Sequence, residues 1–186
     1  RKNEYHLNTG FLSTPFILSV LADGGYVEEA YKLLEQESSP SWLYNVKKGA
    51  TTILEQWTGL DEHAYSYNHY SYGAVCDFLF TRVAGIQPVL EEPGYKKIKI
   101  QPCVGGTLEY SRADYESIYG KIHSEWVKMG EKVKYFFEIP PNTSAVLSLG
   151  TSEEKMESLK KSYPSAAYED GYATFTVGSG TYEMVL

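Results

Sequence analysis

Glu55, Trp57 and His69 are the residues of this sequence whose types and spacing could do chemistry together. Glu55 and Trp57 lie in Gly49-Ala-Thr-Thr-Ile-Leu-Glu-Gln-Trp-Thr-Gly59, and His69 lies in the tyrosine-rich run Ser66-Tyr-Asn-His-Tyr-Ser-Tyr-Gly73. A glutamate carboxylate is ionised at neutral pH and can accept a proton from water. A carboxylate, an indole and an imidazole suit a site that binds a sugar and moves a proton. An ordinary buried polar cluster could hold the same residues.

Two tryptophans are candidates for the wall of such a site. If residues 55–57 are extended, the side chains of Glu55 and Trp57 point to the same side of the backbone. Trp42, in Pro40-Ser-Trp-Leu-Tyr44, is the second candidate. Because a flat indole covers the C–H face of a sugar as readily as it fills a core, each tryptophan is either a pocket wall or a core residue.

His69 falls at the start of a helix that the hydrophobic pattern predicts over about residues 68–84. Unpaired N–H groups and the helix dipole disfavour a positive charge at that end. We therefore expect a neutral imidazole that donates one hydrogen bond and accepts another. A sugar hydroxyl would satisfy such a ring, and so would a structural hydrogen bond.

The composition is that of a globular, acidic chain. Its 186 residues are 42% hydrophobic and carry a net charge of −7, which argues against nucleic acid as a partner because phosphate binding needs clustered Lys and Arg. No stretch approaches the roughly 20 apolar residues of a membrane span, so no membrane partner is expected. Cys76 and Cys103 are expected to be free thiols, and neither metal-ligand spacing nor any cofactor motif is found.

Hydrophobic periodicity divides the chain into a helical part, residues 1–94, and a strand-rich part, residues 95–186. Thr14 as N-cap and Pro15 as the first helical residue predict a helix that ends at Gly24. Further helices are predicted around residues 27–34 and, capped by Ser66 or Asn68, around residues 68–84. Three helices cannot cover one another's apolar faces, so either the strand-rich part covers them or further helices lie in an upstream part of the same protein. The start at Arg1 favours the upstream helices.

Beyond Pro93 and Gly94 the hydrophobic period changes from about 3.6 to 2, which is typical of strands. The predicted strands cover residues 97–101, 107–113, 118–127, 133–139, 145–149, 173–177 and 181–186, with a hairpin turn at residues 129–132. Short strands at this spacing favour an antiparallel β-sandwich, so the predicted fold class is α+β. The polar residues 150–171 are expected to form a short helix or a loop.

Short motifs run through the whole chain in a definite order. In the helical part they are His6-Leu-Asn-Thr-Gly10, Thr14-Pro15, Pro40-Ser-Trp42, Gly49-Ala-Thr-Thr52, Glu55-Gln-Trp57 and Tyr67-Asn-His-Tyr70. In the strand-rich part they are Pro93-Gly-Tyr95, Ile100-Gln-Pro102, Tyr115-Glu-Ser117, Tyr119-Gly120 and Val177-Gly-Ser-Gly-Thr-Tyr182. Each motif is modest alone, but in this order they resemble the C-terminal part of the bacterial α-L-rhamnosidases, an inverting family of glycoside hydrolases.

The resemblance implies a fold and a set of roles. The family's catalytic domain is an (α/α)6 barrel followed by a β-sandwich, so residues 1–94 would be the last barrel helices and residues 95–186 the sandwich. The resemblance implies that Glu55 is the general base that activates water and that His69 contacts the sugar. It also implies that Trp57 and Trp42 line the pocket. The implied partners are a rhamnose-containing glycan or glycoside and the upstream part of the same protein.

The chain departs from the family pattern in two ways. Leu54 and Gln56 stand where the family often has Trp and Arg, and Gln56 removes a positive charge beside the base. An inverting glycosidase also needs a carboxylic acid about 6.5–9.5 Å from the base, and the family places it in an earlier barrel segment. We therefore expect the 186-residue chain alone to be inactive.

Two other functions stay open at this point. The β-sandwich could be a carbohydrate-binding module with the helices as an accessory, or a structural module that covers a barrel without touching substrate. No targeting signal is visible, so periplasmic, secreted and cytoplasmic locations all stay open.

Overall fold

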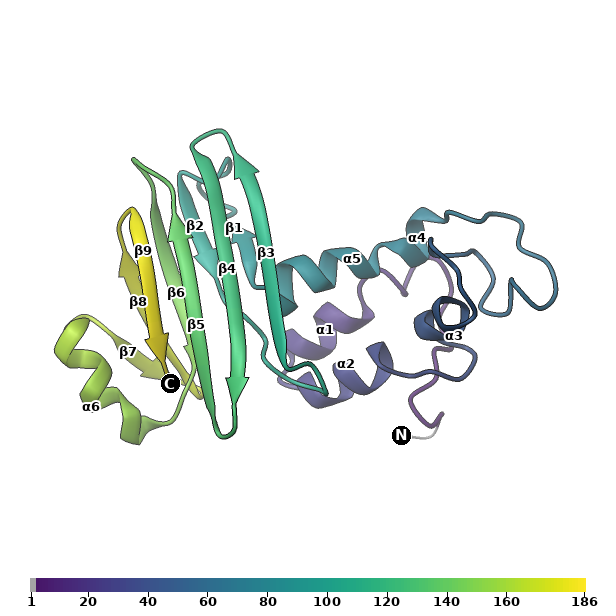
Figure 1. Ribbon diagram of the computed structural model, residues 1–186, viewed down its shortest axis with the longest axis horizontal. Helices are drawn as coiled ribbons and strands as arrows, with labels where there is room; N and C mark the ends of the chain where they lie inside the picture. The colour runs from purple at the N-terminus through teal and green to yellow at the C-terminus, as the bar shows by residue number, and fades with distance from the viewer. Residues whose placement is uncertain (1–2) are drawn as a thin grey trace. The chain divides into compact units, whose positions relative to one another are not determined.

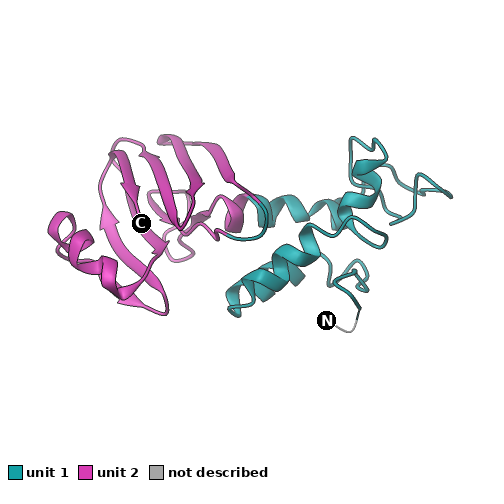
Figure 2. Ribbon diagram, turned by 60° about the horizontal axis from the view of Figure 1, so that its bottom comes forward, with its two compact units in different colours: residues 1–79, 105–107 teal, residues 80–104, 108–186 magenta. Residues whose placement is uncertain are grey.

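The computed structural model describes residues 3–186, which form two compact units. The first unit takes in the chain up to Leu79 together with residues 105–107, and the second takes in residues 80–104 and 108–186 (Figure 2). Helices dominate the first unit and strands the second (Figure 1). The predicted α+β fold class, barrel-type helices followed by a β-sandwich, is confirmed.

The first unit contains five helices within its described residues: α1 Ile17–Asp23, α2 Val27–Leu34, α3 Trp42–Lys47, α4 Tyr70–Gly73 and α5 Val75–Phe78. Helix α1 packs against α2 and α5, and Leu18, Tyr31 and Phe78 are buried. Leu12, Phe16 and Val20 are more than half exposed. The expectation that three helices leave apolar surface uncovered therefore agrees with the structure.

Two helix predictions were wrong in detail. The first helix begins at Ile17 rather than Pro15 because the Thr14 hydroxyl donates back to the Gly10 carbonyl (2.9 Å) instead of capping the helix. The helix predicted over residues 68–84 is broken into α4, α5 and a π-helix, Leu79–Val83. Its N-cap is His69, without a side-chain capping bond, rather than Ser66 or Asn68.

Helix α3 lies in a region where no helix was predicted. It begins after Ser41, whose hydroxyl accepts a hydrogen bond from the Tyr44 N–H (3.2 Å) and so acts as its N-cap. At six residues it is too short to show a clear helical period in the sequence.

Residues 105–107 join the first unit because two glycines allow close contact with Tyr31. A Cβ atom at Gly105 would lie 2.7 Å from the Tyr31 ring, and Gly106 adopts a positive φ of 54°. The Glu35 carboxylate accepts hydrogen bonds from the N–H (2.8 Å) and the hydroxyl (3.1 Å) of Thr107.

The second unit is a sandwich of two sheets (Figure 1). One sheet has the order β1-β2-β6-β8-β7, formed by Ile86–Pro88, Lys97–Ile100, Ser144–Gly150, Tyr172–Val177 and Ala167–Glu169. The other has the order β3-β4-β5-β9, formed by Tyr110–Ser117, Gly120–Met129, Lys132–Ile139 and Gly180–Val185. All pairs are antiparallel except β2 with β6, so the sandwich is mixed rather than purely antiparallel.

The sandwich core follows the predicted alternation of side chains. Ile98, Leu147 and Phe175 come from one sheet and Trp126 and Phe137 from the other, and all are buried. The hairpin at residues 129–132 is confirmed, and the polar segment contains a helix, α6 Glu153–Ser162, followed by β7.

Two further features of the described residues bear on the sequence predictions. Neither Cys76 nor Cys103 forms a disulfide bond, and the first is exposed and the second buried. Among residues 3–186, no helix combines the length and the apolar character needed to cross a membrane.

Candidate active site

Two loop segments bring Glu55 and His69 onto neighbouring stretches of backbone. The His69 N–H donates to the Ile53 carbonyl (2.8 Å), and the Glu55 N–H donates to the Ser66 carbonyl (3.0 Å). The Thr52 hydroxyl also donates to the carbonyl of Tyr67. Residues 52–55 and 66–69 therefore run antiparallel to each other, and this pairing places the two predicted site residues in one region.

Glu55 is half-buried, and its carboxylate forms neither an ion pair nor a hydrogen bond with any residue that the structure describes. Its charge acts on Tyr72, a buried tyrosine of α4. The pKa of the Tyr72 phenol is raised, mainly by burial and further by the negative charge of Glu55, while a hydrogen bond from Trp57 opposes the shift. Glu55 is therefore a charged group close to an aromatic cluster, with its proton-accepting oxygens free of protein partners within residues 3–186.

His69 is held among aromatic rings. Its ring centroid lies 4.6 Å from that of Phe11, 5.3 Å from that of Tyr70 and 5.6 Å from that of Tyr72. Its Nδ1 atom is buried and has no hydrogen-bond partner among the described residues. Leaving a buried polar nitrogen without a hydrogen-bond partner costs free energy. The Nδ1 atom of His69 is therefore available to a partner from outside residues 3–186.

Trp57 and Trp42 meet at right angles, with centroids 5.8 Å apart and an interplanar angle of 89°. Trp57 is half-buried and stacks on Tyr72, at a centroid distance of 4.0 Å and an angle of 14°. Trp42 is only 4% exposed, and its indole N–H donates to the Tyr72 carbonyl (2.9 Å). Trp42 thus has the contacts of a core residue, whereas Trp57 keeps part of its surface accessible.

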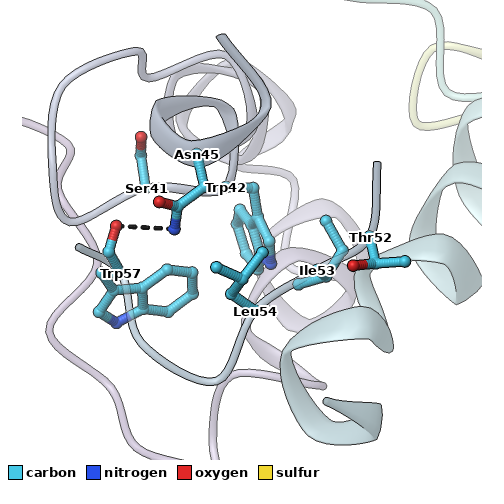
Figure 3. A pocket seen from close by; sticks show the side chains of 7 residues that line it. All are labelled: Ser41, Trp42, Asn45, Thr52, Ile53, Leu54 and Trp57. Atoms are coloured by element: carbon cyan, nitrogen blue, oxygen red, sulfur yellow. Dashed lines mark hydrogen bonds between the residues drawn. The ribbon is translucent and has the colours of Figure 1, made fainter. Parts of the chain in front are cut away.

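A small pocket lies beside these two tryptophans (Figure 3). It is lined by Ser41, Trp42, Asn45, Thr52, Ile53, Leu54 and Trp57, and neither Glu55 nor His69 contributes to it. The space is too narrow for a water molecule, so this pocket is a packing gap rather than a place for a sugar.

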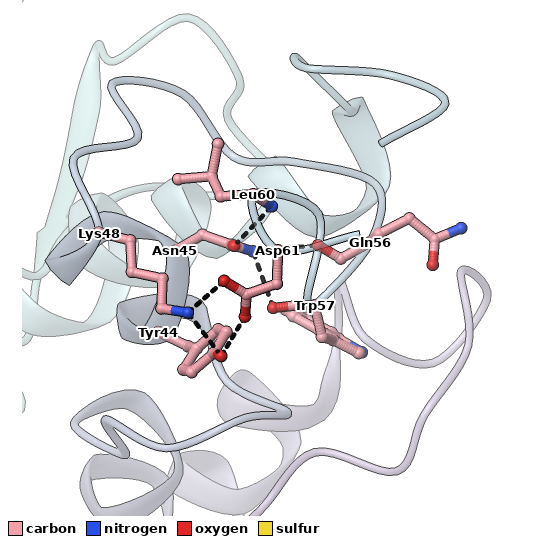
Figure 4. Close-up of polar contacts among 7 residues, drawn as sticks. All are labelled: Tyr44, Asn45, Lys48, Gln56, Trp57, Leu60 and Asp61. Atoms are coloured by element: carbon pink, nitrogen blue, oxygen red, sulfur yellow. Dashed lines mark hydrogen bonds and ion pairs between the residues drawn. The ribbon is translucent and has the colours of Figure 1, made fainter. Parts of the chain in front are cut away.

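The condition under which Glu55 and Trp57 would point to the same side, an extended backbone over residues 55–57, is not met. The backbone bends at Glu55 and Gln56 and enters turns at Trp57. The cause is Asn45 of α3, whose side-chain amide donates to the carbonyls of Gln56 (3.0 Å) and Trp57 (2.9 Å) and accepts from the Leu60 N–H (3.4 Å) (Figure 4). These bonds hold the chain in a bend, so the geometric argument that aligned Glu55 with Trp57 does not apply.

A second set of contacts joins the same loop to α3 at the surface. Asp61 accepts hydrogen bonds from the Tyr44 hydroxyl and from the Lys48 ammonium group, which also donates to the Tyr44 oxygen (2.8 Å) (Figure 4). The hydrogen bond between Lys48 and Asp61 lowers the pKa of the carboxyl and raises the pKa of the ammonium group. Residues 56–61 are thus tied to α3 at two places.

Phe11, Asn45 and Tyr72 contribute to the candidate site but were missed in the sequence. Tyr72 follows His69 by three residues inside the tyrosine-rich run, which was the available signal. Phe11 and Asn45 gave none, because tertiary packing brings them to residues 69 and 56–60. No group of three or more His, Cys, Asp or Glu side chains within residues 3–186 could hold a metal ion.

Comparison with known proteins places the chain in a family. The bacterial α-L-rhamnosidase six-hairpin glycosidase domain matches residues 1–83, and the bacterial α-L-rhamnosidase C-terminal domain matches residues 85–163. The chain belongs to the bacterial α-L-rhamnosidase family. The two matches follow each other in the order that the motifs implied.

Individual relatives agree with this assignment. An α-L-rhamnosidase of Streptomyces avermitilis is 34% identical over 98% of this chain, and one of Formosa agariphila is 38% identical over 83% of it. The crystal structure of the Streptomyces avermitilis α-L-rhamnosidase complexed with L-rhamnose superposes with a TM-score of 0.86 at 32% identity over the whole chain. That of the Aspergillus terreus enzyme gives a TM-score of 0.84 at 28% identity.

The chain spans only a small share of these relatives. It covers 18% of the Streptomyces avermitilis protein and 17% of the Formosa agariphila protein. The similarity therefore covers part of the six-hairpin glycosidase domain and the C-terminal domain of an α-L-rhamnosidase. It does not by itself show the reaction that a whole enzyme catalyses.

Proposed function

We propose that this chain is the C-terminal part of a larger glycoside hydrolase that removes terminal α-L-rhamnose with inversion. The observation that carries the proposal is the half-buried Glu55 carboxylate, without a partner in residues 3–186, in a chain whose two halves match two successive rhamnosidase domains. We propose two domains, the last barrel helices followed by the sandwich. Residues 80–94, which the sequence assigned to the helical part, belong to the second unit because β1 pairs with β2.

Glu55 is the general base in this proposal. Its carboxylate takes a proton from water, the water oxygen bonds to the anomeric carbon, and the glycosidic C–O bond breaks with inversion. A carboxylic acid from the upstream part of the protein protonates the leaving oxygen. Two carboxyl groups in inverting enzymes lie about 6.5–9.5 Å apart, which leaves room for the water.

His69 hydrogen-bonds a sugar hydroxyl, and Trp57 contributes to the pocket wall. The support for His69 is its buried Nδ1 atom, which has no partner among residues 3–186, and the support for Trp57 is its partial exposure. Trp42 acts behind Trp57, since it is buried and its N–H already has an acceptor.

The test uses the complete protein that contains this chain and an aryl α-L-rhamnoside as substrate. We expect Glu55→Gln to lower kcat by about 10²–10⁴-fold, the usual contribution of general acid–base catalysis. Glu62→Gln, a matched change at an exposed position of the same loop, should leave kcat unchanged. Wild-type kcat in Glu55→Gln would contradict the proposal, as would hydrolysis by the 186-residue chain alone.

A structural role is the second candidate for residues 95–186. It is favoured by the four-stranded sheet, where Lys121 pairs with Glu138 (2.6 Å) and the Nδ1 atom of His123 pairs with Asp114 (2.7 Å). In these two contacts, the buried Nε2 atom of His123 is left without a hydrogen-bond partner among the described residues. Calorimetry with rhamnose-containing oligosaccharides separates this role from a carbohydrate-binding module. Binding that survives deletion of residues 1–79, which leaves the second unit and its strand β1 intact, would favour the binding module.

A further inference from the structure

Asn45 is a buried side chain whose hydrogen bonds all go to the residues that follow Glu55. It is 5% exposed on α3, and its two amide hydrogens go to the carbonyls of Gln56 and Trp57. Its carbonyl oxygen accepts from the Leu60 N–H. An asparagine side chain has two donor hydrogens and one acceptor oxygen, so both donors and the acceptor serve this one loop.

These contacts hold the backbone that directly follows Glu55 in the chain, while the pairing with residues 66–69 holds Glu55 itself. The Glu55 N–H donates to the Ser66 carbonyl, and the carbonyl of the next residue, Gln56, accepts from the Asn45 amide. The backbone around the carboxylate is thus tied on both sides although no regular secondary structure covers residues 55–57.

Lys48, one residue beyond α3, adds a second tie through Asp61 at the far end of the loop. Its side chain is 39% exposed, and exposed ion pairs contribute little free energy. We expect this tie to be the weaker of the two.

We propose that α3 positions the Glu55 carboxylate, with Asn45 as the main positioning residue and Lys48 as a weaker one. The proposal rests on the function proposed above. Because Asn45 is 5% exposed and its side chain is bonded to residues 56, 57 and 60, its role in this proposal is to hold the loop in place. A misplacement of about 1 Å at a reacting group can cost on the order of 10²-fold in rate.

The experiment compares Asn45→Asp with Asn8→Asp in the complete protein, with an aryl α-L-rhamnoside as substrate. Aspartate keeps the size of asparagine but has no amide hydrogens, so it repels the two carbonyls that Asn45 binds. Asn8 is exposed, and its substitution adds the same charge to the same unit. We expect kcat to fall about 10²-fold in Asn45→Asp with little change in KM, and both constants to stay unchanged in Asn8→Asp.

Azide provides a readout that simple loss of structure would not move. Azide is an anion that needs no deprotonation. Its terminal nitrogen bonds to the anomeric carbon as the glycosidic bond breaks, and the aryloxide leaves with the bond's electron pair. If Asn45→Asp fails because the base is displaced, added azide restores aryl release and gives a glycosyl azide. A pocket that has collapsed gains nothing from azide.

The outcomes separate this inference from the proposed function. If Glu55→Gln is active, the proposed function fails. If Glu55→Gln is inactive, two results for Asn45→Asp overturn the positioning role. One is a wild-type kcat, and the other is a loss of activity that azide does not restore although the melting temperature of the variant is normal. Should Asn45→Asp fail to fold, Asn45→Ala, which removes the same hydrogen bonds without adding a charge, decides. A loss of kcat that azide restores supports the role of α3, and an unchanged kcat overturns it.

Discussion

The two units each hold a histidine and a carboxylate beside an aromatic ring, but the two groups pair with each other only in the sandwich. In the four-stranded sheet, His123 Nδ1 is 2.7 Å from the Asp114 carboxylate, and the His123 ring packs against Phe136 at 5.3 Å. The buried Nε2 atom of His123 has no hydrogen-bond partner among the described residues. In the helical unit, His69 packs against Phe11 at 4.6 Å, but within residues 3–186 its Nδ1 atom has no partner.

This difference separates groups that stabilise the fold from groups that are available for chemistry. Asp114 has His123, Lys121 and Arg112 around it, so its charge already has partners in the folded chain. Glu55 has no ion pair among the described residues. A buried polar group without a partner costs free energy, and functional sites are where such a cost is tolerated, because a ligand supplies the missing partner.

The largest expected effect on stability distinguishes the tryptophans of the two units. Trp126 is 0% exposed, and its N–H donates to the Val83 carbonyl (2.7 Å). Trp126→Ala should lower the free energy of unfolding of the sandwich by about 3–5 kcal/mol. Trp57→Ala, at a half-buried ring that stacks on Tyr72, should destabilise its unit less. Urea unfolding of the chain followed by circular dichroism measures both, and equal losses would remove the contrast between a core and a site tryptophan.

The next largest effect concerns the two histidines. His69→Gln should lower kcat/KM of the complete protein by about 2- to 10-fold, the loss of a hydrogen bond between neutral groups worth about 0.5–1.5 kcal/mol, with little loss of stability. His123→Gln should lower the free energy of unfolding by about 1–3 kcal/mol because the ring is buried and bonded to Asp114, with normal kinetic constants. Steady-state kinetics and urea unfolding of both variants test the pair, and a reversed pattern would contradict the comparison.

The sequence was more informative about the sandwich than about the candidate site. Alternating residues such as Ile98 and Ile100 of β2 gave a strand that the structure confirms, because the pattern of a half-buried strand is local. The parallel pairing of β2 with β6 could not be predicted, since residues 97–100 meet residues 144–147 only through tertiary structure.

At the candidate site, the residue types were readable but their arrangement was not. Glu55 and His69 were predicted from motifs, and the backbone bonds between residues 53–55 and 66–69 bring their segments together. Whether each residue has its proposed role stays a prediction. The bend after Glu55 depends on Asn45, ten residues earlier in the chain. An asparagine in a six-residue helix gives no sign in the sequence of the carbonyls that it will bind.

The smallest effect in this comparison is the dependence of the sandwich on pH through Asp114. The hydrogen bond from His123 lowers the pKa of the Asp114 carboxyl, and the charges of His123, Lys121 and Arg112 act in the same direction. Because the folded pKa lies below the ordinary value of about 3.9, the ionised carboxylate stabilises the fold above that value. This contribution is lost as the pH falls through the folded pKa.

Asp114→Asn should therefore lower the free energy of unfolding of the sandwich at neutral pH, and the difference from wild type should shrink steadily below about pH 4. The side chain is 38% exposed, and solvent screens its charge, so we expect a difference below about 1 kcal/mol. Urea unfolding at several pH values between neutral and acid gives the profile, and Glu131→Gln, at the exposed hairpin turn, controls for loss of one negative charge. A difference that stays constant across this range would mean that Asp114 acts as a neutral hydrogen-bond acceptor. In that case the ion pairs of Asp114, of a kind that Glu55 does not form with any described residue, would contribute nothing to the free energy of unfolding.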